Sequence, residues 1–285
     1  MRKFSISILL LALITIGMVI PTVSATDNQV VITYGETCYL NNDYKNIVDT
    51  YFANHVNNFN QAMVKIITAN EVNKISSSIT QKTYDSSQIF SSALVDLSNP
   101  EDLTVDVDIS KITTINQDMY KSALESAGIT KGHVVVTSPV TATGESALTG
   151  VMNCYEDATN TTIPDEVKEA ANNEIYTESQ IVENSNVNPD TLSEIVDDVK
   201  EEVQDKNITD SNQISDIIEN ISENNNIHLS SSDVNNLASA IQDVHDVQDI
   251  ANKYKDEFSN IIGENGDSII DQILKPLLGF FGINT

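Results

Sequence analysis

The order of apolar and polar residues predicts a strand and then a helix early in the chain. Residues 30–34 form a short apolar run that ends at Gly35, as expected for a buried strand. From about residue 44 to residue 67, apolar side chains recur at spacings of three and four, which predicts one long amphipathic helix. The stripe that this helix would turn to the core is Val48, Phe52, His55, Phe59, Met63 and Ile66.

Two further stretches alternate with a period of two residues. Residues 89–97 and 103–109 each place apolar side chains on one face of a strand, and the turn-forming segment 98–102 separates them. We expect the two strands to pair as an antiparallel hairpin. Asp106 and Asp108 would then share its solvent face, where a calcium site is the alternative to a simply hydrated pair of carboxylates.

Residues 116–156 predict a helix, a strand and a second helix. The first helix should stop at Gly128, because glycine accepts the left-handed conformation of a helix end. A strand follows at residues 134–136 and ends before Pro139, and Thr143 can cap the next helix. Together with the preceding strand this is a strand-helix-strand unit, whose crossover should be right-handed in a shared sheet.

The remainder of the chain predicts helices. One should run from Asp165 to about Val182, and three similar segments follow that begin at Leu192, Ile214 and Val234. Each segment carries apolar residues at its first, fourth, fifth and eighth positions, with capping residues in front of it. We expect three short helices that pack on one another, with a peptide-binding array of helical hairpins as the alternative reading.

The two ends of the chain have their own patterns. Residues 1–25 combine two basic residues, an apolar core and small residues before Ala25, which predicts a cleaved secretory signal peptide, with a retained anchor as the alternative. Residues 261–285 are apolar but contain Asp271, Lys275 and Pro276, so they are too polar for a secure membrane span. We expect this tail to dock on the body of the protein or to contact a membrane surface or a partner.

These patterns predict an α+β fold with a small mixed sheet, followed by an acidic and mostly helical portion. The predicted divisions are the signal peptide at 1–25, a mixed domain at 26–160, the acidic helices at 161–260 and the tail at 261–285. Residues 156–285 contain 28 acidic and 6 basic residues, and the whole chain carries a net charge of −27. Nucleic acid is excluded as a partner, because phosphate backbones require clustered basic residues.

The chain has two cysteines, Cys38 and Cys154. In a secreted protein they could form one disulfide, and the alternative is two reduced thiols buried as small apolar side chains. The sequence leaves both readings open.

Three segments together resemble a known family of secreted proteins. They are residues 118–129, the strand at 134–140 and the Gly-Glu-Ser-Ala-Leu-Thr-Gly segment at 144–150. In combination they resemble the secreted, YpuA-like proteins of the domain-of-unknown-function 1002 family, and the resemblance extends to the strand at 31–35 and the acidic helices. It implies an extracytoplasmic protein of the cell envelope with no established activity.

Candidate chemistry is sparse. Ser146 follows a strand and begins a helix like the serine of a nucleophile elbow, but the final glycine of that motif is missing. The turn before this helix is a better candidate, since hydroxyl groups beside free backbone N–H groups can hold an anion, although they can equally cap the helix. That turn supplies the candidate ligand-binding residues Ser138, Thr141, Thr143 and Gly144.

No catalytic residue, metal site or cofactor is predicted, because the remaining histidines and acids have no partner residues at the spacing that such sites need. The sequence favours a non-catalytic binding or structural module that meets an unidentified envelope component or protein partner. The alternative is a secreted hydrolase that acts on an envelope polymer. An enzyme should bring polar residues such as His133 and Ser146 together in a cleft.

Overall fold

A five-stranded mixed sheet organises the first half of the computed structural model, which describes residues 29–79, 83–99 and 101–262. The strands are β1 (Val30–Gly35), β2 (Met63–Ile67), β3 (Ser92–Asp96), β4 (Thr104–Val107) and β5 (His133–Thr137). They lie in the order β2-β1-β3-β5-β4, with β3 antiparallel to β1 and β5, and with β2 and β4 parallel to their neighbours. The predicted α+β class is confirmed.

Two sequence predictions fall outside the described residues. The signal peptide at 1–25 lies before them, and the apolar tail at 261–285 lies beyond them except for its first two residues. Both remain predictions.

The predicted hairpin of β3 and β4 is wrong, because β5 lies between these two strands. β4 pairs in parallel with β5, with Val105 opposite Val134, and the helix between them makes the crossover. The exposure pattern gives the physical reason. β5 carries three consecutive buried valines and needs neighbours on both sides, whereas Thr104 and Asp106 of β4 are exposed and suit an edge.

The long helix predicted for residues 44–67 is only half correct. Helix α2 (Asn42–His55) is capped by Asn41 at its start and by Val56 at its end, and a 3-10 turn (Phe59–Gln61) leads into β2. The β-branched residues of β2 pair with β1, with Val64 opposite Ile32. Helix α3 (Ala69–Ile79) follows, where the sequence predicted no helix.

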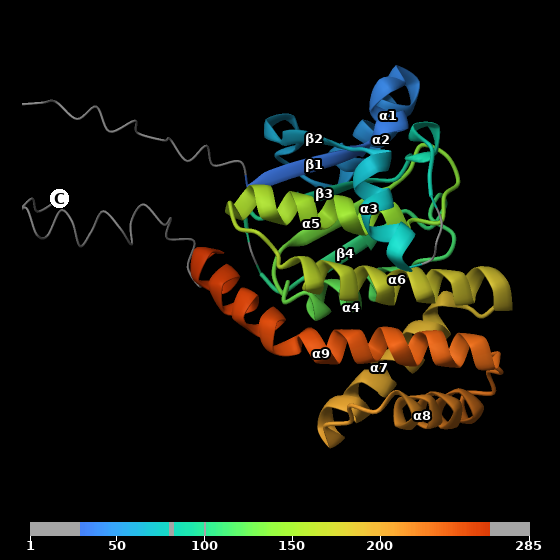
Figure 1. Cartoon of the computed structure of the whole chain (residues 1–285). Coiled ribbons are helices and arrows are strands. Elements are labelled where there is room, and N and C mark those ends of the chain that lie inside the picture. The colour runs from blue at the N-terminus through green and yellow to red at the C-terminus, as the bar shows by residue number, and fades with distance from the viewer. Residues whose placement is uncertain (1–28, 80–82, 100, 263–285) are drawn as a thin grey trace, which may run out of the picture.

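Helices cover both faces of the sheet. On one face α1 (Glu36–Leu40) and α2 bury Cys38, Val48 and Phe52 against alternate residues of β1. On the other face lie α4 (Gln117–Ser126) and α5 (Glu145–Thr159). Figure 1 shows α5 running across the sheet, with α2 on the far side. Gly150 of α5 permits this close approach, because an added Cβ would lie 2.5 Å from Oγ1 of Thr33.

Four more helices stack away from the sheet, with the last of them lying between the first and the other two (Figure 1). They are α6 (Asp165–Ser185), α7 (Pro189–Lys206), α8 (Ser211–Asn224) and α9 (Ser231–Ile262), and α9 packs on both α6 and α8. The three similar segments lie in α7, α8 and α9, and their apolar residues face the interior. The third segment opens a helix of 32 residues rather than a short one.

The hydrophobic core continues from the sheet into these helices. The same cluster of buried residues that contains Val31 and Val134 also contains Ile195, Ile218 and Phe258. Near the end of α9, Phe258 packs edge-on against Tyr155, with 5.6 Å between ring centroids, and stacks on Tyr254. The described helices include none that is long and apolar enough to cross a bilayer.

Candidate functional site

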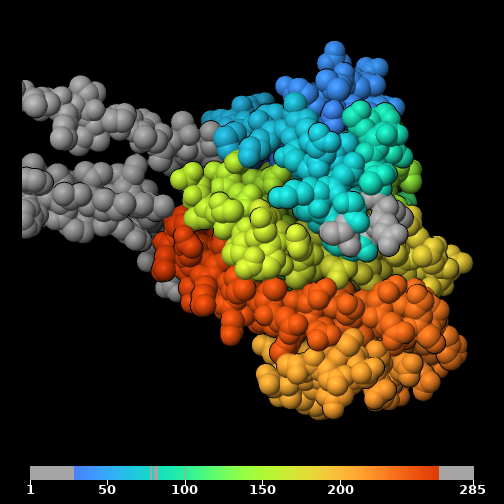
Figure 2. All heavy atoms as spheres, in the orientation of Figure 1, coloured from blue at the N-terminus to red at the C-terminus, as the bar shows by residue number. Residues whose placement is uncertain are grey.

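A groove of about 570 Å³ lies between α6 and α9, and Ile79 of α3 also lines it. Figure 2 shows α9, in red and orange, as a band between the helices above it and α7 with α8 below it. The groove is lined by Glu166, Glu169, Ala170, Asn173, Thr177 and Gln180 of α6, and by Asn236, Ser239, Asp243, Asp246 and Val247 of α9. Its volume lies in the range of known ligand sites.

Helical periodicity places these side chains in the groove. Residues 166, 169, 173, 177 and 180 follow spacings of three and four along α6, while its buried face carries Val167, Ala171 and Ile175. On α9 the buried and groove-lining residues alternate in the same way. The amide of Asn173 donates a 2.8 Å hydrogen bond to Oδ2 of Asp243 and thereby joins the two helices across the groove.

The groove is strongly negative. Within the described part of the chain, the carboxylates of Glu166 and Glu169 have no hydrogen-bond or ion-pair partner. Asp243 accepts a hydrogen bond from the neutral amide of Asn173, and Oδ1 of Asp246 lies 3.8 Å from Nδ1 of His245. Unpaired carboxylates along a hollow surface concentrate negative potential, so the groove can attract and hold cationic groups.

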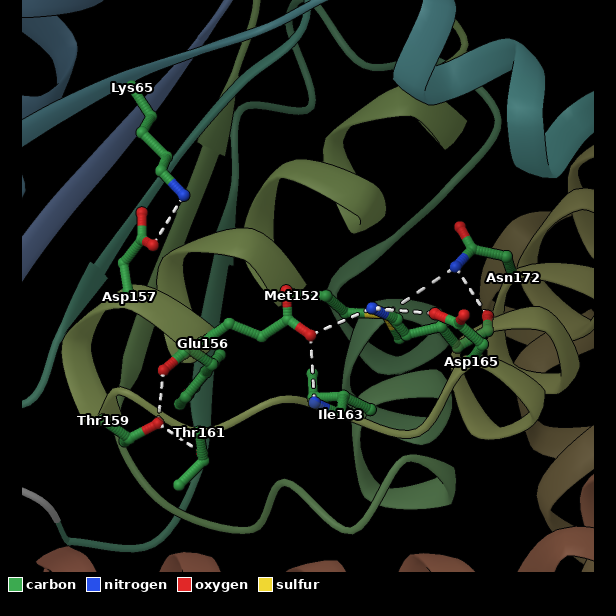
Figure 3. Close-up of polar contacts among 11 residues, drawn as sticks. Lys65, Met152, Glu156, Asp157, Thr159, Thr161, Ile163, Asp165 and Asn172 are labelled. Atoms are coloured by element: carbon green, nitrogen blue, oxygen red, sulfur yellow. Dashed lines mark hydrogen bonds and ion pairs between the residues drawn. The ribbon is translucent and has the colours of Figure 1, made fainter.

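A second hollow of about 140 Å³ lies where α3, α5 and α6 meet, and one of the two lysines that line it, Lys168, is already engaged. Nζ of Lys168 lies 2.9 Å from Glu156 and 3.3 Å from Asp165, and Glu156 also accepts from the backbone of Ile163. Figure 3 shows these contacts around the turn between α5 and α6. Burial alone would lower the pKa of Lys168, but the two carboxylates outweigh it and raise that pKa. This lysine therefore ties the turn together.

The predicted anion-binding turn before α5 is partly buried. Ser138 is fully buried, Thr141 is exposed, and Thr143 donates from its hydroxyl to Glu145 in the first turn of the helix. Gly144 precedes the helix with a φ of 110°, a conformation that favours glycine, and its carbonyl accepts from Tyr120. The structure thus brings Thr143 and Gly144 to the helix start.

The carboxylate of Glu145 lies at that same helix start. It is buried and also accepts a 2.7 Å hydrogen bond from Ser179 of α6. A carboxylate in the first turn already offers the helix N-terminus the negative charge that it favours. An anion from solution would therefore have to compete with the protein's own side chain.

Ser146 and His133 are not in contact. His133 begins β5 and places Nε2 2.8 Å from Oδ2 of Asp106 on β4, whereas Ser146 lies in α5, which follows the opposite end of β5. Asp108 accepts hydrogen bonds from Ser110 and from Thr137. In the described residues no group of three or more His, Cys, Asp or Glu side chains could hold a metal ion.

Cys38 and Cys154 are free thiols in the structure, so the disulfide reading is wrong. The two residues lie on opposite faces of the sheet. Cys38 packs with Tyr34 and Phe52, and Cys154 lies 3.7 Å from the hydroxyl of Thr33. Burial raises the pKa of Cys38 to about 11 and that of Cys154 to about 12, which keeps both thiols protonated and unreactive.

Ellman's reagent should therefore find no reactive thiol in the folded chain and both thiols after unfolding in guanidinium chloride. Intact mass measured without reductant provides the check. A mass lower by two hydrogen atoms, together with unreactive thiols in denaturant, would show a disulfide and contradict this expectation.

A buried cluster of charged residues was missed by sequence reasoning. Glu174 and Glu178 of α6 are both completely buried, and Glu174 forms a 2.6 Å ion pair with Lys200 of α7. Two acids four residues apart normally indicate a hydrated helix face. The available signal was their position between Ala171, Ile175 and Ile181, on a helix that is otherwise apolar on that side.

Comparison with known proteins identifies a family. The family model described as "Protein of unknown function (DUF1002)" matches residues 34–261. The chain is 27% identical over 179 residues to the protein named "Uncharacterized protein YpuA" of Bacillus subtilis (strain 168), an alignment that covers 60% of this chain and 61% of that protein. The chain thus spans less than two thirds of its relative's length, and no solved structure matches it. The match over most of its length places the chain in the DUF1002 family of proteins of unknown function.

Proposed function

We propose that this chain is a non-catalytic binding protein that works outside the cytoplasm, in secreted form or at the cell envelope, and holds a basic peptide segment of a protein partner. The groove between α6 and α9 is the observation that carries the proposal. It combines ligand-sized volume with the unpaired carboxylates of Glu166 and Glu169. The signal-peptide pattern of residues 1–25 supports the location.

The lining suits a peptide in particular. Carboxylates form strong, charge-assisted hydrogen bonds with lysine and arginine side chains. The amides of Gln180 and Asn236 and the hydroxyls of Thr177 and Ser239 can donate to and accept from peptide groups. The groove is therefore equipped for both the side chains and the backbone of a basic segment.

The alternative of a secreted hydrolase has less support. A serine hydrolase requires its nucleophile and base in a shared cleft, and Ser146 and His133 lie at opposite ends of β5.

Binding of a fluorescent octalysine peptide to the full chain, followed by anisotropy, tests the proposal. The triple variant Glu166→Gln, Glu169→Gln, Asp243→Asn should weaken binding about tenfold, since it removes three exposed charges at about 0.5 kcal/mol each. The affinity of the unmodified chain should also fall as salt is added.

The matched control removes three exposed charges from α8 by Asp216→Asn, Glu219→Gln and Glu223→Gln, residues that lie away from the groove. This control should bind like the unmodified chain. If both triple variants lose the same affinity, octalysine responds to overall charge and the groove has no special role.

A further inference from the structure

A cluster of charged and hydroxyl groups is enclosed where α4, α6 and α7 meet. Lys200 of α7 donates to Glu174 of α6 at 2.6 Å and to the hydroxyls of Ser122 and Ser126 of α4 at 2.8 and 2.7 Å. Both serine hydroxyls also donate to Glu174, at 3.1 and 2.9 Å. The ion pair between Lys200 and Glu174 is therefore well supplied with hydrogen bonds.

Glu178 lies one helical turn further along α6 and has no such support. Both of its carboxylate oxygens are buried without a hydrogen-bond partner in the described structure. The charged groups that act on it are Glu174 on its own helix and Lys200 and Asp197 on α7. Around them, Asp118 of α4 acts on Asp197, and His245 of α9 lines a cavity of about 60 Å³ that Lys200 also lines.

This environment favours the protonated form of Glu178. Burial is the largest cause and the negative charge of Glu174 the second, and together they raise the pKa of Glu178 well above its usual range. Lys200 opposes the shift, but it is already paired with Glu174. Loss of the proton from Glu178 would place a second buried carboxylate beside one lysine, which a buried site tolerates poorly.

We propose that Glu178 makes the docking of α7 on α4 and α6 depend on pH. While Glu178 holds its proton, α7 packs firmly and Lys200 stays within the cluster. As the pH rises, the chain lowers its free energy by letting water reach Glu178, and separation of α7 from α6 is the motion that admits it. The protonation state of this buried carboxyl thus controls how firmly the helices that follow α6 are docked.

The sign follows from proton linkage. The docked state has the raised pKa and so binds more protons than the opened state, in which Glu178 is hydrated. The contribution of Glu178 to docking is therefore greatest below the pKa of a hydrated glutamate, about 4.3, and declines as the pH rises toward the pKa in the docked state. In that window the opening equilibrium of α7 should increase by up to about tenfold per pH unit for the one proton involved.

Hydrogen exchange of the full chain, read by mass spectrometry from about pH 5 to about pH 9 and corrected for intrinsic exchange, measures this opening. Protection of residues 189–206 should fall steeply with pH in the unmodified chain. In Glu178→Gln it should stay nearly constant, because the amide does not ionise. The control Glu194→Gln changes an exposed acid of α7 and should keep the pH dependence of the unmodified chain.

A second variant guards against poor folding of the first. Glu178→Leu replaces the carboxyl by an apolar group and should also abolish the pH dependence. The proposal is overturned if the protection of α7 falls equally in the unmodified chain and in whichever Glu178 variant folds. It is also overturned if the amides of β1, β3 and β5 lose as much protection as those of α7, since the pH effect would then be global unfolding.

Discussion

Replacement of Lys200 by methionine is expected to lower the free energy of unfolding by about 3–5 kcal/mol at neutral pH. The side chain of Glu174 is completely buried, and Lys200 is its cationic partner. Methionine keeps much of the apolar stem of lysine but removes the charge, so the carboxylate of Glu174 would be left uncompensated. Urea denaturation, with the slope of the transition checked for two-state behaviour, gives the measurement.

Two further variants separate the buried charge from general effects of the substitution. The double variant Lys200→Met, Glu174→Gln should recover much of the loss, because it removes the orphaned carboxylate. Lys206→Met removes a lysine that is paired with Glu202 on the exposed side of the same helix and should change stability by less than about 1 kcal/mol. Equal losses in Lys200→Met and Lys206→Met would contradict the assigned role of the buried pair.

Gly128→Ala is expected to destabilise the chain by about 2–5 kcal/mol, for two reasons that add. Gly128 has a φ of 79°, a conformation that costs other residues about 1–2 kcal/mol. The new Cβ would also lie 2.4 Å from the backbone oxygen of Ala251, so α9 would have to move away from the end of α4. Thermal unfolding followed by circular dichroism gives the loss.

Asn207→Ala provides the matched control for the backbone conformation. Asn207 follows the last residue of α7 with a φ of 49° and is exposed; because asparagine already carries a Cβ in this conformation, alanine there should cost less than about 1 kcal/mol and meets no collision. A loss in Gly128→Ala of no more than about 2 kcal/mol, the conformational cost alone, would mean that contact with α9 adds nothing.

Local patterns predicted the parts of the fold that depend on local sequence. The valine run of β5, the apolar face of α5 and the caps of α7 and α8 all lie where periodicity and capping residues indicate. Strand β2 was missed because the stripe of α2 continues by coincidence through Phe59, Met63 and Ile66. Pairing with β1 decided its structure, and the sequence does not reveal which strands become neighbours.

The candidate sites were harder to predict because their parts are distant in the chain. Glu174 meets a lysine 26 residues away, and Asn173 meets Asp243 across 70 residues. Each residue alone resembles part of a hydrated helix face, so its role appears once α6 lies beside α7 and α9. Conversely, the hydroxyls of the turn before α5 looked available in the sequence, yet Thr143 donates to a carboxylate of the protein itself.

The contact between Tyr155 and Phe258 also constrains the order in which the protein can be completed during synthesis. The ring of Tyr155 is fully buried, and Phe258 supplies one of its walls near the end of α9. Helix α5 therefore stays partly uncovered on the growing chain until residue 258 has left the ribosome. Folding of the sheet portion is then tied to the arrival of the last described helix, and a nascent chain cut before α9 would expose the aromatic surface that Phe258 covers.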